Sequence, residues 1–169
     1  AAAASLVWMF IEWFRFGRPS LVGIVTGMVA GLATVTPASG FIGVPGGLIL
    51  GVAGGVACYV AVDLIRVRLK IDDSLDVFAV HGCGGILGSL LVAYLALPAF
   101  GGLGLANGVT AGSQFMVQLA SVAITVLWTG IGSYVILKVI GAVIGLRVDQ
   151  QDEIAVSYTH LTLPTKLAV

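Results

Sequence analysis

The chain has 169 residues, of which 59% are hydrophobic and 9% are charged, and its mean hydropathy is +1.10. Soluble domains carry roughly 25% charged residues, so this composition excludes a soluble globular protein and predicts an integral membrane protein. Eight cations balance eight anions, so no excess of positive charge indicates nucleic-acid binding. Cys58 and Cys83 lie in apolar stretches without the spacing of metal ligands, so we expect buried thiols and neither a metal site nor a cofactor.

The predicted transmembrane spans lie in two long stretches without Lys, Arg, Asp or Glu, at residues 20–62 and 77–137. A spanning helix needs about 20 apolar residues, and turns rich in proline and glycine divide each stretch in two. We therefore expect an all-α, polytopic transmembrane helix bundle of four full spans, at residues 20–36, 47–65, 77–96 and 113–145. Residues up to Trp13 are expected to end a truncated first span, and the opening without Met predicts a fragment of a longer protein.

The cations that flank these spans all fall on one side of the predicted membrane. They are Arg15, Arg18, Arg66, Arg68, Lys70, Lys138 and Arg147. The opposite loops, near residues 37–47 and 97–112, contain no Lys or Arg, which predicts that the basic side and the carboxy terminus are cytoplasmic. We expect a multi-pass protein of the plasma or inner membrane, in contact with lipid.

Glycines recur every four residues in three of the predicted spans. The sets are Gly23, Gly27 and Gly31, then Gly47, Gly51 and Gly55, then Gly84 and Gly88. Such ridges let helix backbones approach closely in lipid, which is the interpretation we favour. The alternative is that some of these glycines line a conduit.

His81 is the only His, Lys, Arg, Asp or Glu between residues 77 and 137. An ionisable group at that depth in a membrane span predicts a functional site, here a pore-lining one. The alternative is a structural histidine that hydrogen-bonds to a neighbouring helix. Val77, one helical turn earlier, is a candidate wall residue or a packing residue.

Several polar residues near the ends of the spans are expected to be structural. Asp72 and Asp73 are predicted to cap the helix that carries His81. Asp76 is predicted to cap that helix and tether its loop or, alternatively, to shape the electrostatics of an exit vestibule. Asp63 and Arg66 are spaced for an i, i+3 salt bridge. Near the turn at Pro37, the Thr36 hydroxyl is expected to satisfy backbone groups that the turn releases.

Four sequence blocks occur in order along the chain: GRPSLVG at residues 17–23, GLATVTPASG at 31–40, DDSLDVFAVHG at 72–82 and GLRV at 145–148. Together they resemble the ammonium transporter family, Amt/Mep/Rh. The resemblance extends from about Leu6 to Val148 and corresponds to the end of the seventh span through the eleventh in that family. It implies that this chain is a carboxy-terminal half of such a protein.

The resemblance implies a homotrimer of eleven-helix protomers, each with its own hydrophobic pore for ammonium or ammonia. In that family two histidines hydrogen-bond to each other midway along the pore. His81 matches the second, and the first would precede this chain. The pair would relay the proton while ammonia crosses, because the ammonium ion is costly to desolvate and an imidazole of pKa about 6.5 can accept its proton. A fragment with one of the two histidines is not expected to transport by itself.

Two alternatives use the same scaffold, an ammonium sensor and an Rh-type gas channel. A third, an unrelated proton-handling membrane subunit, would carry a carboxylate in mid-helix, whereas Asp63 and Asp76 lie near span ends. No nucleophile, base and orienting residue occur in a recognisable arrangement, so we do not expect an enzyme.

The last residues depart from the family pattern. Residues 149–155 match the start of the cytoplasmic tail, through which the resemblance implies gating and contact with PII-type regulatory proteins. Residues 156–169 resemble a translated sequencing adapter, so we expect them to be non-native and exclude His160 from the site. The expected organisation is a partial transmembrane domain at residues 1–148 followed by these two short segments.

Overall fold

The computed structural model describes residues 1–144, 146 and 151. The predicted tail at 149–155, Gln151 excepted, and the predicted non-native segment at 156–169 lie outside the described residues. The chain divides into two compact units, Ala1–Ala123 and Ile124–Val169, and the candidate site lies in the first.

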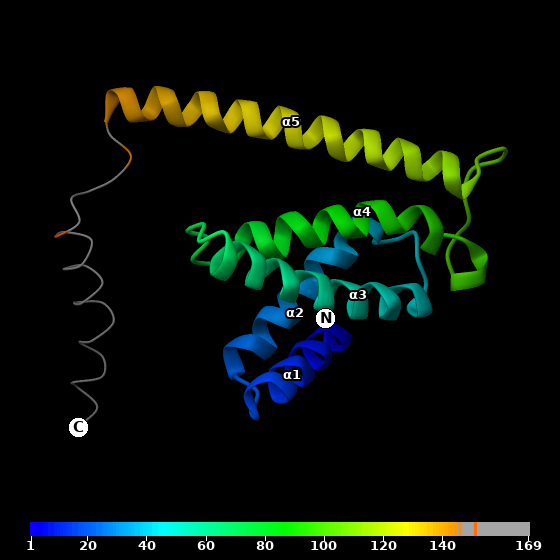
Figure 1. Ribbon diagram of the computed structural model, residues 1–169. Helices are drawn as coiled ribbons and strands as arrows, with labels where there is room; N and C mark the ends of the chain where they lie inside the picture. The colour runs from blue at the N-terminus through cyan, green and yellow to red at the C-terminus, as the bar shows by residue number, and fades with distance from the viewer. Residues whose placement is uncertain (145, 147–150, 152–169) are drawn as a thin grey trace. The chain divides into compact units, whose positions relative to one another are not determined.

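The described residues form helices and no strands, as the sequence predicts. The α-helices are α1 (Ala2–Phe16), α2 (Leu21–Val35), α3 (Val44–Val62), α4 (Cys83–Leu95) and α5 (Ala111–Val143) (Figure 1). Short 3-10 helices follow α2 and α4, at Thr36–Ala38 and Pro98–Phe100. Two π-helical segments adjoin α3 and α4, at Asp63–Arg68 and Phe78–Gly82.

Four helical segments are long and apolar enough to cross a membrane, which confirms the predicted number of full spans within the described residues. They are Leu21–Ala38, Val44–Arg68, Phe78–Leu95 and Ala111–Val143. The second begins earlier than predicted, because Pro45 lies in the first turn of α3 and does not break the helix. Proline is tolerated there, since the first backbone N–H groups of a helix have no intrahelical partner.

In the first unit, α1, α2 and α3 contact one another, and α4 contacts α2 and α3. The glycine ridges of α2 and α3 make the contacts with α1 possible. A Cβ atom added at Gly31 would lie 2.8 Å from the Ala4 Cβ, and one added at Gly51 would lie 3.0 Å from the Ala3 Cβ. The first distance is too short for carbon atoms and the second is unusually tight, which supports the packing interpretation at Gly31 and Gly51. A Cβ at Gly47 would meet no atom within 4 Å outside its own helix, so that glycine of the second ridge does not share this packing.

Thr34 is the centre of the contact between α2, α3 and α4. It is fully buried, and its hydroxyl donates to the Ala30 carbonyl at 2.7 Å. Gly54 of α3, with Gly84 and Gly88 of α4, surrounds it so closely that a Cβ at any of the three would press on Thr34. The polar side chain is therefore satisfied by its own helix and enclosed by glycines.

The structure bears out the predictions for Thr36 and for the two cysteines only in part. The Thr36 hydroxyl bonds a carbonyl at the helix end, as expected, but that carbonyl belongs to Leu32 and also accepts the backbone N–H of Thr36. Cys58 is fully buried, as predicted, and its thiol donates to the Val80 carbonyl at 3.6 Å. Cys83 is only partly buried.

Replacement of Gly88 by Ala tests the close packing around Thr34. The added methyl group would overlap the Thr34 carbonyl oxygen, so we expect the free energy of unfolding to fall by about 1–3 kcal/mol. Gly85→Ala is the matched control, because its new Cβ would meet no atom within 4 Å apart from the backbone of its own helix, and it should stabilise α4 by roughly 0.5–1 kcal/mol. Unfolding of the purified protein in detergent measures both effects, and equal effects would contradict this packing.

Candidate functional site

Charged side chains gather at one end of the first unit, where α1 ends and the π-helical segment of α3 begins. Arg15 Nη1 lies 3.3 Å from Asp63 Oδ1, and it donates to the Tyr59 hydroxyl at 3.2 Å. These contacts, first with Tyr59 and then with Asp63, raise the pKa of Arg15 above its usual value. Arg68 Nε lies 3.8 Å from the other Asp63 oxygen. Asp63 thus joins the ends of α1 and α3.

The predicted Asp63–Arg66 salt bridge is wrong. Arg66 instead pairs with Asp76, across the loop that leads to the His81 helix. The reason is the π-helical hydrogen bonding of Asp63–Arg68, which places residues five apart on the same side of the helix. Asp63 therefore meets Arg68 and not Arg66.

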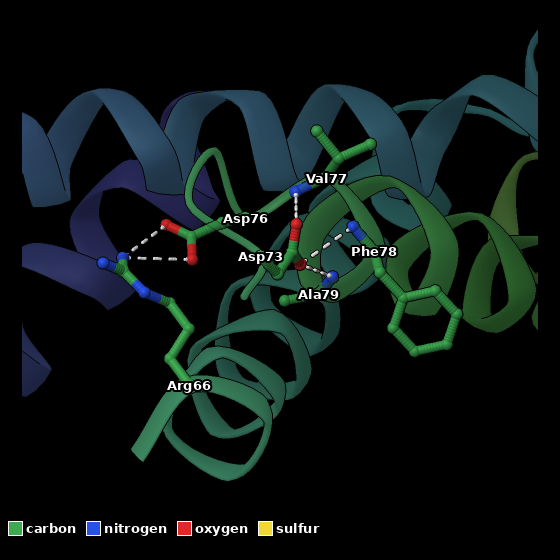
Figure 2. A network of polar contacts seen from close by, with 6 residues as sticks. All are labelled: Arg66, Asp73, Asp76, Val77, Phe78 and Ala79. Carbon is green, nitrogen blue, oxygen red and sulfur yellow. Dashed lines mark hydrogen bonds and ion pairs between the residues drawn. The ribbon is translucent and has the colours of Figure 1, made fainter. Parts of the chain in front are cut away.

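Asp73 is the N-terminal cap of the helix that carries His81 (Figure 2). One carboxylate oxygen accepts the backbone N–H of Val77 at 2.8 Å. The other accepts those of Phe78 at 3.0 Å and Ala79 at 3.1 Å. The structure confirms the predicted capping role of Asp73, while the same role for Asp72 stays a prediction.

Asp76 holds the loop and leaves the capping to Asp73. Its backbone adopts a left-handed conformation, with φ of 55°, and its carbonyl accepts the N–H of Val80 at 2.8 Å. Arg66 Nη1 lies 3.2 Å and 3.4 Å from its two carboxylate oxygens. The tethering part of the prediction for Asp76 is therefore correct, and its capping part is not.

His81 lies on the exposed side of the π-helical segment Phe78–Gly82. The neighbouring residues Ala79 and Val80 are buried, and this segment contacts α2 and α3. Within the part of the chain that the structure describes, no group hydrogen-bonds to the imidazole of His81. The alternative of a histidine bonded to a neighbouring helix thus has no support among these residues.

Val77 and Phe78 lie beside His81 in the sequence and expose apolar surface. Their exposed fractions are 53% and 60%. Packing inside the first unit therefore does not account for Val77, and its role as a wall residue stays a prediction.

A cavity of about 240 Å³ lies at the charged end of the first unit. Glu12, Ser20, Arg66 and Asp76 are among the residues that line it. Glu12 was missed in the sequence: its carboxylate accepts the backbone N–H of Ser20 at 2.6 Å and the Ser20 hydroxyl at 3.1 Å. The available signal was a single carboxylate in an apolar segment, eight residues before a serine that caps α2. In residues 1–144, 146 and 151, no group of three or more His, Cys, Asp or Glu could hold a metal ion.

Comparison with protein families finds a match over residues 1–160 to the model of the Ammonium Transporter Family. Among curated relatives, the ammonium transporter Amt1 of Archaeoglobus fulgidus is 44% identical over 155 residues, which cover 90% of this chain and 38% of that protein. The ammonium transporter of Aquifex aeolicus is 42% identical over 154 residues, with coverage of 90% and 36%. The chain thus spans well under half the length of these relatives.

Solved structures show the same similarity. Mep2 of Saccharomyces cerevisiae superposes with a TM-score of 0.75 at 32% identity, covering 89% of this chain and 36% of that one. A structure described as a sensor Amt protein superposes with a TM-score of 0.79 at 28% identity, with coverage of 90% and 37%.

A double-mutant cycle tests the pairing of Arg66. The cycle of Arg66→Gln with Asp76→Asn should give a coupling energy of about 0.5–1 kcal/mol, since the Arg66 side chain is 48% exposed and the Asp76 side chain 16%. The matched cycle of Arg66→Gln with Asp63→Asn should give a coupling close to zero. Unfolding of the purified variants in detergent provides both values. The assignment fails if the Asp63 cycle shows the larger coupling.

Proposed function

The chain belongs to the ammonium transporter family, and on this premise we propose that the complete protein carries ammonium or ammonia across a membrane. The observation that carries the proposal is the exposed His81, which stands in a membrane-spanning helix without a hydrogen-bond partner among the described residues. An imidazole in that position can exchange a proton with a substrate or with a second imidazole.

The chemistry follows from the cost of charge in an apolar pore. A desolvated ammonium ion is expensive there, whereas neutral ammonia is cheap, so a group in the pore has to accept the proton. His81 would accept it and pass it to a second histidine from outside this chain, while ammonia crosses separately. The exposed apolar surfaces of Val77 and Phe78 support a hydrophobic wall beside it.

Asp76 is the weaker candidate for a role in the pore. Its carboxylate faces the Arg66 guanidinium, which offsets its negative charge. The pairing supports a tether for the loop more than an electrostatic exit vestibule.

The proposal also includes the orientation of the complete protein in the membrane, its assembly and its regulation. Arg15, Arg66 and Arg68 meet at one end of the first unit through ion pairs, which supports a common side for the cations and a cytoplasmic carboxy terminus. A homotrimer and a PII-type partner at the tail are carried by the family resemblance. Because the chain spans 38% of its Archaeoglobus relative and supplies one imidazole of a pair, we expect no transport by this chain alone.

A sensor is the second candidate function, favoured by the similarity to the sensor Amt structure. A sensor would bind ammonium without net flux, and an Rh-type gas channel would carry ammonia without current. Flux and current measured together therefore separate the three possibilities.

Replacement of His81 by Ala in the complete protein tests the relay. In proteoliposomes, the ammonium-evoked current should fall by roughly 100-fold, because the apolar pore loses its proton acceptor. Tyr94→Phe is the matched control: it removes a polar group from a 42% exposed residue of α4 and should leave the current unchanged. A current and substrate selectivity that survive His81→Ala unaltered would remove the relay from the proposal.

A further inference from the structure

We propose that Asp73 is a positioning residue for His81: its carboxylate holds the start of the π-helical segment and thereby sets the direction of the imidazole. The inference rests on the proposed function, in which His81 handles a proton. It concerns the same site, and it assigns to Asp73 a task beyond capping.

The Asp73 carboxylate accepts several hydrogen bonds at the start of the His81 helix. Both of its oxygens are used, by the backbone N–H groups of Val77, Phe78 and Ala79 (Figure 2). A helix cannot satisfy its first N–H groups itself, and hydrogen bonds to an ionised acceptor are stronger than neutral ones. A single side chain therefore fixes three consecutive peptide groups, the last of them two residues before His81.

The backbone around His81 has an unusual helical form. The segment Phe78–Gly82 has π-helical hydrogen bonding, a rare form that occurs mostly as single turns and often at functional sites. A π-helical turn contains one residue more than its α-helical alternative. Because an α-helix advances about 100° per residue, a shift of register by one residue would turn the His81 side chain by about that angle.

The π-helical turn at Phe78–Gly82 is also held by a contact with α3. Ala79 and Val80 are buried, and the Cys58 thiol of α3 donates to the Val80 carbonyl at 3.6 Å. The turn is thus held at its N–H groups by Asp73 and at a carbonyl by Cys58. The imidazole of His81 has no hydrogen bond of its own within the described residues, so among these bonds only those of the backbone bear on its direction.

Asp76 is not placed to accept these hydrogen bonds in place of Asp73. Asp76 is closer in sequence to the helix, but both of its carboxylate oxygens face Arg66 Nη1, at 3.2 Å and 3.4 Å. Its left-handed backbone conformation marks the point where the loop turns into the helix. Loss of the Asp73 carboxylate would therefore leave three N–H groups without their acceptor.

The test uses the complete protein and the variants Asp73→Leu and Asp73→Asn, with and without His81→Ala. Asp72→Asn is the matched control, because it removes the neighbouring carboxylate of the same loop and leaves the three bonds of Asp73 in place. The readouts are the ammonium-evoked current and the ratio of methylammonium to ammonium current in proteoliposomes. The ratio does not depend on how much protein is folded, so a general loss of stability does not change it.

We expect Asp73→Leu to lower the ammonium current by about tenfold and to move the current ratio toward the value of His81→Ala, because a misplaced imidazole accepts the proton less effectively than a well-placed one. Asp73→Asn keeps one acceptor oxygen and should move the ratio by a smaller amount, and it serves as the test if Asp73→Leu does not fold. In the His81→Ala background, replacing Asp73 should not change the ratio further. Asp72→Asn should keep the original ratio.

Two outcomes separate this inference from the proposed function. If His81→Ala changes the current but both Asp73 variants keep the original current ratio, Asp73 is only a structural cap and the inference is wrong. If His81→Ala leaves current and ratio unchanged, the relay itself is wrong, and Asp73 then has no task beyond capping.

Discussion

Hydrocarbon offers no hydrogen-bond partner, so each polar group in a membrane span has to be satisfied by protein or by what the protein carries. Two threonines of the spans illustrate this constraint. Thr34 donates to the carbonyl of Ala30, and Thr129 to that of Thr125, each at 2.7 Å. The imidazole of His81 has no such bond from a described residue. The proposed function assigns it a partner from outside the described residues.

The same constraint explains where the carboxylates lie. Asp63 and Asp76 pair with arginines at the ends of helices, and Asp73 bonds peptide groups at the start of one. Each negative charge thus lies at the edge of the predicted span and has a fixed partner. These contacts connect α1, α3 and the His81 helix at one end of the first unit.

Contacts that depend on local spacing were predictable from the sequence, and contacts that depend on register or tertiary approach were not. The long uncharged stretches and the turns that divide them predicted the spans, and Asp73 was recognisable as a cap because it stands just before an apolar helix. The pairing of Asp63 was missed because a π-helical segment leaves no periodicity signal in so short a stretch. The bond that Ser20 donates to Glu12 and the bond that Cys58 donates to Val80 join separate helices, so the residue spacing within one helix does not predict them.

The most direct test of the central claim, that His81 is completed by a second imidazole from outside this chain, is nitrogen NMR of the complete protein with labelled histidine. The His81 signals, assigned by their loss in His81→Ala, should show a ring nitrogen hydrogen-bonded to another imidazole. They should also shift when the candidate partner histidine is replaced. A His81 ring that shows no hydrogen bond to another imidazole and whose signals respond to no other histidine would contradict the account.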